Sequence, residues 1–337
     1  MKVGIDGASG YAGAELLRLC AGHRELEVVV AGADSQAGQP VAALYPSLAG
    51  AYGSLSFSKV RTEDLDGLDV VFLALPHGQS QRLAPALVGR VGLLVDLAAD
   101  FRLRDPAAYP VWYGAEHEAP GLLERFAYGL PELFGPALAG AGLVAAPGCY
   151  PTAAALALAP LVRAGMVAAD GIIVDAASGT SGAGRNPSPA MHFATVDENF
   201  TAYGLLDHRH TPEIEQAVGA EVLFTPHLAP MTRGILATCY ARPTAPCTTA
   251  EVLDLLGRTY AEAPFVVVAE ESPSTKATWG SNAAHLTARV DGRTGWVIVL
   301  CALDNLGKGA AGQAVQCVNL IEGWSETMGL STVGIYP

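Results

Sequence analysis

One cysteine of this sequence stands where a reactive thiol is expected. The run Pro147-Gly148-Cys149-Tyr150-Pro151 comes just before an apolar stretch, residues 153–164, whose composition predicts a helix. A thiol at a helix N-terminus feels the positive end of the helix dipole, which lowers its pKa and favours the thiolate. Thiolates attack carbonyl carbons and acyl phosphates, so Cys149 is predicted to be a catalytic nucleophile. Most cysteines are small buried side chains, and the surrounding glycine and prolines favour the catalytic interpretation here.

Histidines downstream of this cysteine offer the proton carrier that such a nucleophile needs. His208 and His210 flank Arg209 just before a helical segment, and His192 is a third candidate. We expect one of the paired histidines to act as the acid/base and Arg209 to contact an anion. Two histidines spaced in this way also share one face of a strand and would suit a metal, but no third ligand is evident. No metal site is therefore predicted.

A glycine-rich turn near the N-terminus has the spacing of a dinucleotide-binding loop. It follows a strand-like segment, residues 3–6, and opens a helical segment, residues 14–21. Glycines allow a tight turn and a close approach of the backbone, so the amides at the helix N-terminus can face a pyrophosphate. The context of strand, turn and helix supports this prediction. The expected cofactor-binding residues are Gly7, Ser9, Gly10, Tyr11, Ala12 and Gly13.

The second predicted strand, residues 27–31, is followed closely by Asp34 and Ser35. A carboxylate at this position of a dinucleotide-binding fold accepts hydrogen bonds from an unphosphorylated ribose, whereas NADP sites carry arginine or small polar groups there. Asp34 therefore favours NAD mildly, and the residues alone leave the choice between NAD and NADP open.

Two further segments have the composition of ligand-binding loops. A second glycine-rich loop follows the predicted strand 171–176, and its amides and hydroxyls suit a phosphate or the nicotinamide end of a cofactor; it contains Ser178, Gly179, Ser181 and Gly182. Arg102 lies just beyond the predicted strand 93–96, at the edge of a parallel sheet where ligands collect. We expect Arg102 to bind a substrate carboxylate or phosphate, although a surface ion pair explains an isolated arginine equally well.

The elements that must position these residues fall into two groups. In the first half, short apolar strands alternate with helical segments, which predicts a doubly wound parallel sheet of the Rossmann type. After Pro151 the strands are longer and alternate more, which indicates an α+β domain with a mixed sheet. The pattern therefore predicts two domains with a boundary near residue 149, and the last helical stretch, residues 309–324, could belong to either.

The composition excludes several classes of protein. The net charge of −13 disfavours binding to nucleic acid or to an anionic membrane surface, although it allows a small anionic substrate. No apolar run reaches the ~18 residues that a membrane helix needs, and the N-terminus does not resemble a signal peptide. The six cysteines have neither disulfide-scaffold nor zinc-finger spacing. We therefore expect a cytoplasmic protein of two domains.

Several motifs together are similar to those of one enzyme family. The chain resembles the N-acetyl-gamma-glutamyl-phosphate reductases of arginine biosynthesis, within the semialdehyde dehydrogenase superfamily, nearly from end to end. The segment 144–160 fits that family's active-site signature. The motifs that carry the resemblance are residues 7–13, 75–80, 99–102, 128–132, 147–152, 178–185, 208–213, 224–228, 280–282 and 308–313.

This resemblance implies a reaction and roles for particular residues. Cys149 would attack N-acetyl-L-glutamyl 5-phosphate, release phosphate and form a thioester, which NADPH would reduce to the semialdehyde. His210 is the first choice for the acid/base and His208 the second, while Arg102, His192 and Arg209 would bind substrate. Pro76, Asn305 and the loop 178–182 would face the cofactor. The family fold returns the last helix to the Rossmann domain, so the resemblance implies a cofactor domain of residues 1–148 with 305–337 and a catalytic and oligomerisation domain of residues 149–304. We expect a homodimer or homotetramer.

Three alternatives to this function are considered. Reductases of carrier-linked aminoadipyl phosphate in lysine synthesis look closely similar, but their acidic carrier would be repelled by a protein of pI near 5. Aspartate-semialdehyde dehydrogenase shares the chemistry, but its cysteine and histidine motifs differ from those around Cys149 and His210. A regulatory module that has lost catalysis would not need these residues. The family generally uses NADPH, and Asp34 leaves use of NADH open.

Overall fold

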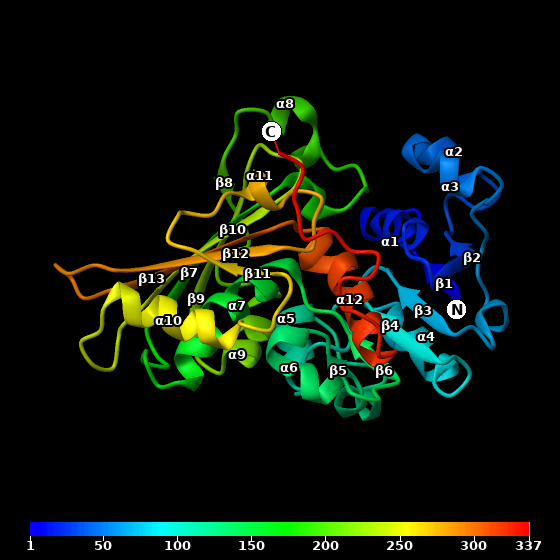
Figure 1. The fold of residues 1–337 in the computed structure, drawn as a ribbon. Coiled ribbons are helices and arrows are strands. Elements are labelled where there is room, and N and C mark those ends of the chain that lie inside the picture. Colours follow the sequence, from blue (N-terminus) through cyan, green and yellow to red (C-terminus); the bar gives the residue numbers. More distant parts are fainter. Residues whose placement is uncertain (337) are drawn as a thin grey trace. The chain divides into compact units, whose positions relative to one another are not determined.

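The computed structural model describes residues 1–336, which divide into two compact units (Figure 1). The first unit comprises Met1–Pro147 and Ala310–Leu330, and the second comprises Gly148–Gly309 and the segment from Ser331 on. The sequence analysis assigned all of 305–337 to the first unit. The structure differs because residues 305–309 and the chain after Leu330 pack within the second unit.

The first unit is built on a six-stranded sheet in which every pairing is parallel, as expected for a Rossmann-type fold. Its central strands are buried along their whole length, which explains their almost purely apolar sequences. In sheet order the strands are β2 (Glu27–Gly32), β1 (Lys2–Asp6), β3 (Val70–Leu73), β4 (Leu93–Asp96), β6 (Leu143–Ala145) and β5 (Ala127–Tyr128).

Helices connect these strands and bury their apolar faces. Helix α1 (Tyr11–Ala21) directs Leu16, Leu17 and Cys20 into the core, as their spacing predicts. The last helix, α12 (Gly312–Ile321), lies in this unit, where Gln313 Nε2 donates a 2.7 Å hydrogen bond to the carbonyl of Gly129. The other α-helices of the unit are α2 (Val41–Leu44), α3 (Ala49–Tyr52), α4 (Ser80–Leu87), α5 (Ala108–Tyr113) and α6 (Pro131–Leu138).

The second unit contains a seven-stranded mixed sheet, as the longer alternating strands predict. Neighbouring strands pair antiparallel except for β7 with β9 and β11 with β12. In sheet order the strands are β11 (Val266–Val268), β12 (Ala284–Val290), β13 (Val297–Leu303), β10 (Ile235–Ala241), β7 (Ile172–Ser178), β9 (Val222–Leu228) and β8 (Thr201–Ala202).

One face of this sheet is covered by helices (Figure 1). Helix α7 (Cys149–Arg163) packs against β10 and β13, and its buried positions run without interruption from Tyr150 to Leu161. Five of those residues are alanines, which allow the helix to lie close to its neighbours on every side. The remaining α-helices are α8 (Phe193–Val196), α9 (Thr211–Val218), α10 (Thr249–Thr259) and α11 (Thr275–Thr278), and a π-helical turn spans Gly307–Ala311.

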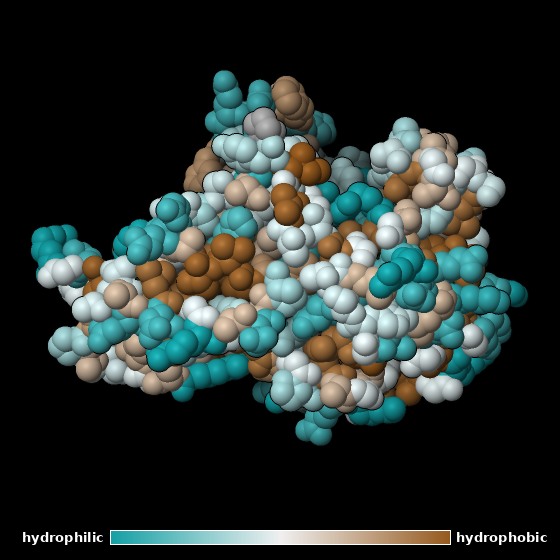
Figure 2. Space-filling model, viewed as in Figure 1, coloured by the Kyte–Doolittle hydropathy of each residue, from teal (hydrophilic) through white to brown (hydrophobic). Residues whose placement is uncertain are grey.

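Hydrophilic and hydrophobic residues are mixed over the face drawn in Figure 2. Within residues 1–336, none of the helices has the length and apolar character needed to span a bilayer.

Candidate active site

The predicted dinucleotide loop has the geometry that its glycines suggest. Gly7 follows β1 with a φ of +86°, and a Cβ there would lie 2.2 Å from the carbonyl oxygen of Ala74. A Cβ on Gly13 would lie 2.3 Å from the oxygen of Gly7, so neither position accepts a side chain. Gly10 is the N-cap of α1, whose first amides have no partner within the helix. This loop therefore fits the pyrophosphate of a dinucleotide.

The residues expected to choose between NAD and NADP lie at the carboxyl end of β2. Asp34 and Ser35 are both exposed, and the charge of Asp34 helps raise the pKa of Asp6, whose main cause is burial. An exposed carboxylate at this point of the sheet is available to a ribose diol. Pro76 is also exposed and lies in the loop after β3. Ala74, in the same loop, lies close to Gly7.

Arg102 is more enclosed than a substrate-binding arginine on a surface would be. Its side chain is 8% exposed, and it donates hydrogen bonds of 2.8 Å to the carbonyls of Ala146 and Leu97. These contacts join the ends of β4 and β6, so part of the guanidinium holds the backbone at the edge of the sheet. Nearby, His77 Nδ1 lies 2.5 Å from the fully buried carboxylate of Asp100, a pair that the sequence analysis did not predict.

Cys149 is the first residue of α7 and is partly buried. Gly148, the N-cap, has extended backbone angles and donates its N–H to Glu213 Oε1 at 2.8 Å. The turn at Gly309 packs closely against Cys149, because a Cβ added at Gly309 would lie 2.7 Å from the Cβ of Cys149. The nucleophile predicted from sequence thus stands at a helix N-terminus, where the dipole favours its thiolate.

The two histidines form an aromatic cluster with Tyr150, the residue after the cysteine. The rings of His208 and His210 are 4.8 Å apart, and each lies 5.8 Å from the ring of Tyr150. Tyr203 completes the cluster: its hydroxyl donates to that of Tyr150 at 3.2 Å, and the Tyr150 hydroxyl donates to the carbonyl of His227. One cluster therefore holds both predicted acid/base residues beside the nucleophile's own helix.

The two histidines differ in their electrostatics. Burial, with the charge of Arg209 as the second cause, lowers the pKa of His208 to about 4. The backbone N–H of His210 donates to His208 Nδ1 at 3.1 Å, so the proton of the neutral ring lies on Nε2. His208 is thus a neutral ring at pH 7 with one nitrogen already used by the backbone.

The second glycine-rich loop differs from its prediction. The glycine-rich composition predicts free amides there, but the amides of Gly179, Thr180 and Ser181 donate to backbone carbonyls in the segment 231–234. The physical reason is that this segment lies directly against the loop: a Cβ on Gly179 would lie 2.7 Å from the amide of Arg233. Those amides fix the loop, and the side chains remain as the groups that could meet a cofactor.

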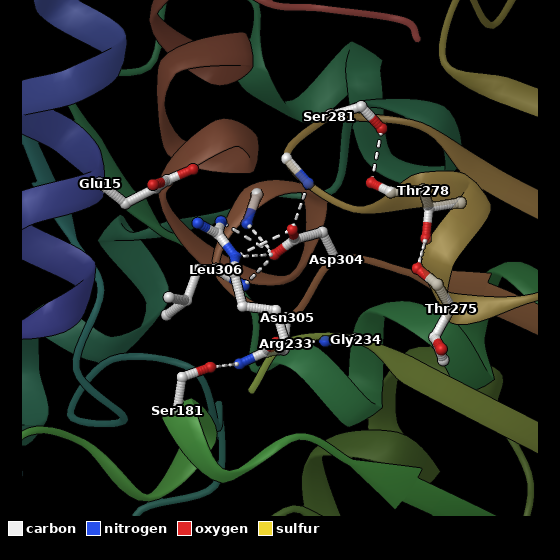
Figure 3. Close-up of polar contacts among 12 residues, drawn as sticks. Glu15, Ser181, Arg233, Gly234, Thr275, Thr278, Ser281, Asp304, Asn305 and Leu306 are labelled. Atoms are coloured by element: carbon white, nitrogen blue, oxygen red, sulfur yellow. Dashed lines mark hydrogen bonds and ion pairs between the residues drawn. The ribbon is translucent and has the colours of Figure 1, made fainter. Parts of the chain in front are cut away.

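Asn305 joins this loop to its neighbours (Figure 3). Its Nδ2 donates to Ser181 Oγ at 2.9 Å, and its Oδ1 accepts from the amide of Gly234 at 2.7 Å. The adjacent Asp304 is fully buried and ion-paired with Arg233 at 3.0 Å, and it also accepts backbone amides at Gly280, Leu306 and Gly307. The structure therefore brings together three predicted cofactor residues, Ser178, Ser181 and Asn305, within the second unit.

Two predicted substrate residues lie on exposed segments. Arg209 is exposed between the two histidines, and His192 is exposed at the N-cap of α8. Tyr203, Glu213 and Asp304 were not singled out from the sequence. For Glu213 a signal was present, because it belongs to the same motif, 208–213, as the histidines.

Comparison with known families assigns the two halves of the chain. Residues 2–141 match the semialdehyde dehydrogenase NAD binding domain, and residues 149–305 match the semialdehyde dehydrogenase dimerisation domain. Among solved structures, aspartate semialdehyde dehydrogenase II of Vibrio cholerae, complexed with ASA, aligns with a TM-score of 0.71 at 17% identity, covering 96% of this chain and 98% of that one. The enzyme from Candida albicans, solved with NADP, aligns with a TM-score of 0.66 at 15% identity, covering 95% and 98%. These structures share the fold.

Curated relatives match over the full length at much higher identity. N-acetyl-gamma-glutamyl-phosphate reductase of Symbiobacterium thermophilum is 53% identical, covering 100% of this chain and 99% of the relative. Those of Desulforudis audaxviator and Synechococcus elongatus are 49% and 45% identical, covering 100% of this chain and 100% and 98% of the relatives. The identity over the full length shows that the chain belongs to the N-acetyl-gamma-glutamyl-phosphate reductase family of semialdehyde dehydrogenases.

Proposed function

We propose that this protein reduces N-acetyl-L-glutamyl 5-phosphate to N-acetyl-L-glutamate 5-semialdehyde and phosphate with NADPH, in arginine biosynthesis. The observation that carries the proposal is the position of Cys149 at the start of α7, beside the cluster of Tyr150, His208 and His210. The names of relatives 44–53% identical over the whole chain support the substrate.

The chemistry follows from these residues. The Cys149 thiolate attacks the acyl carbon, the bond from carbon to the phosphate oxygen breaks, and inorganic phosphate leaves a thioester behind. A bound nicotinamide cofactor would supply the hydride that reduces the thioester carbon. His210 would protonate the resulting oxyanion to a thiohemiacetal and then take back the hydroxyl proton, so that the C–S bond breaks, the aldehyde leaves and the thiolate is restored.

His210 is our proposed acid/base. His208 has a pKa of about 4 and an Nδ1 that accepts from the backbone, so it is a weak base at neutral pH and serves to orient the turn. Substrate anions would be bound by Arg209, His192 and Arg102.

The cofactor is proposed to bind the glycine loop 7–13 with its pyrophosphate at the N-terminus of α1. Its nicotinamide end would meet Pro76, Asn305 and the side chains of the loop 178–182. NADPH is the proposed reductant, with NADH accepted to some extent because Asp34 offers a carboxylate to an unphosphorylated ribose.

We further propose a homodimer or homotetramer formed through the open face of the mixed sheet. Most of the half-buried alternate residues of β7, β10 and β13 are apolar or aromatic, among them Ile173, Leu236, Ile298 and Leu300, while Asp175 and Thr238 are polar. The match to a dimerisation domain over residues 149–305 supports this arrangement. Light scattering during size-exclusion chromatography tests it directly.

The decisive test is the reverse reaction, in which NADP reduction with N-acetylglutamate semialdehyde must depend on added phosphate. Aspartate semialdehyde and a carrier-linked aminoadipate semialdehyde are the competing substrates, and NAD is run beside NADP. Cys149→Ser should abolish turnover while leaving cofactor binding intact. Turnover of aspartate semialdehyde but not of N-acetylglutamate semialdehyde would refute the proposal.

A further inference from the structure

Glu213 carries a buried carboxylate that the proposed chemistry does not use. It lies in the first turn of α9 and its side chain is fully buried. Burial of a charge is costly unless hydrogen bonds or helix dipoles compensate. Its Oε1 accepts the backbone N–H of Gly148 at 2.8 Å, so one carboxylate stands at the N-terminal turns of two helices, α9 and α7, where the dipoles favour an anion.

Glu213 connects the segment that carries the nucleophile with the segment that carries the proposed acid/base. On α7, Gly148 immediately precedes the nucleophile Cys149. On α9, His210 is the N-cap, and its carbonyl accepts the amide of Ile214 at 2.8 Å as part of the helix. The carboxylate of Glu213 therefore contacts the residue that precedes Cys149, and Glu213 itself lies three residues after His210 in the sequence.

Gly148, the residue before the cysteine, is held at both its N–H and its carbonyl. Its N–H donates to Glu213, while the carbonyl of Gly148 accepts both the amide and the hydroxyl of Thr152 at 2.9 Å. The first amides of a helix lack partners inside that helix, so without Glu213 the N-cap amide would need water or another acceptor. The hydrogen bond to Glu213 thus joins Gly148 to the histidine-bearing turn, in addition to the ring contacts of Tyr150 with the two histidines.

We propose that Glu213 is a positioning residue, which holds the Cys149 thiol at a fixed position relative to the His210 ring. It does so because its hydrogen bond connects the first turn of α9 to the N-cap residue of α7. The inference rests on the proposed function, because it concerns the groups that act in that reaction. It requires a hydrogen-bond acceptor at 213 with the reach of a glutamate side chain, and it does not require the negative charge.

The same helix provides a matched control. Glu215 also lies on α9 and also accepts a backbone N–H, that of Val222 at 3.2 Å, but this contact leads to β9. Replacing either glutamate by alanine removes one carboxylate and one backbone hydrogen bond from α9. Only the change at 213 releases the turn that carries the nucleophile.

The experiment compares Glu213→Gln, Glu213→Ala and Glu215→Ala in the full-length enzyme, measuring kcat and KM in the reverse reaction together with thermal stability. Glu213→Gln retains the acceptor oxygen and should keep kcat within about fivefold of wild type. Glu213→Ala should lower kcat about 10²-fold with KM changed less than about twofold, since a shift of about 1 Å between reacting groups has an effect of that order. Glu215→Ala should keep kcat within about twofold.

Two results would overturn the proposal. The first is a folded Glu213→Ala enzyme with wild-type kcat, and the second is a Glu213→Gln enzyme as impaired as Glu213→Ala. If the alanine variant does not fold, Glu213→Asp replaces it with the same expectations, because the side chain is shorter by about 1.5 Å.

A second readout separates this inference from the proposed substrate. Alkylation by iodoacetamide needs no substrate, and peptide mapping distinguishes Cys149 from Cys247, the other cysteine that is not fully buried. Glu213→Ala should slow alkylation of Cys149 at least about fivefold, with Cys247 unchanged and Glu213→Gln near wild type. This pattern supports positioning even if wild type does not use N-acetylglutamate semialdehyde, and equal rates in all variants contradict it.

Discussion

A substitution at Gly309 tests whether contact with the turn at Gly309 fixes the position of the Cys149 thiol. The perturbation is Gly309→Ala, which adds one methyl group 2.7 Å from the Cβ of Cys149 and 3.1 Å from its Cα. Unstrained carbon atoms lie about 3.5–4.0 Å apart, so the two backbones must separate by roughly 1 Å. The Gly309 amide donates to the carbonyl of Asp304 at 2.9 Å, and this bond opposes movement of the turn itself.

A displacement of that size at the reacting thiol should lower kcat by about 10²-fold. It should also change the rate of Cys149 alkylation, whereas cofactor affinity should remain within about threefold, since the proposed pyrophosphate loop lies in the other unit. The assay is steady-state turnover in the reverse direction, with cofactor binding followed by fluorescence titration.

Gly257→Ala is the matched control. Gly257 lies inside α10 of the same unit, and a Cβ there has nothing within 4 Å. This change should leave kcat unaltered and raise stability by about 0.5–1 kcal/mol, because alanine is the better helix former. A Gly309→Ala enzyme with the kcat and alkylation rate of wild type would refute the argument that contact with this turn seats the thiol.

Further predictions concern protonation and cofactor choice. Burial raises the pKa of Asp96 to about 7, so the folded state loses stability as the pH rises from about 4 to about 7, by up to roughly 1.4 kcal/mol per pH unit. The free energy of unfolding in urea should therefore depend less on pH over that range in Asp96→Asn than in wild type. An unchanged pH dependence would contradict the raised pKa of Asp96. His210→Asn should lower turnover by about 10²–10⁴-fold and His208→Asn by much less, with the reverse ranking exchanging their roles. Asp34→Arg should raise kcat/KM for NADPH relative to NADH, and an unchanged ratio would show that Asp34 does not face the ribose.

The sequence predicted the parts of this protein whose signals are local. Strands β4 and β6 begin and end where their apolar runs do, and the glycine loop was recognisable because strand, turn and helix follow one another within about twenty residues. Cys149 stood out through its immediate neighbours.

What the sequence did not predict depends on contacts between distant segments. The loop 178–182 was expected to offer free amides, but its partners, 231–234, come about fifty residues later. Glu213 reaches Gly148 across 65 residues, and nothing in its local sequence indicates that acceptor. Strand β12 was not predicted although His285, Thr287 and Arg289 alternate with apolar residues, because two of those apolar residues are alanines, which are depleted in strands; its pairing with β13 extends over seven residues.

The alanine-rich burial of α7 has a consequence for motion in this protein. A helix enclosed from Tyr150 to Leu161 opens only when the surrounding core opens, so its amide hydrogens should be among the slowest to exchange with solvent. Cys149 therefore lies on a helix that we expect to be among the least mobile parts of its unit. Adjustment to substrates of different length would fall to the exposed segment around Phe193 and Leu206, which are 82% and 77% exposed.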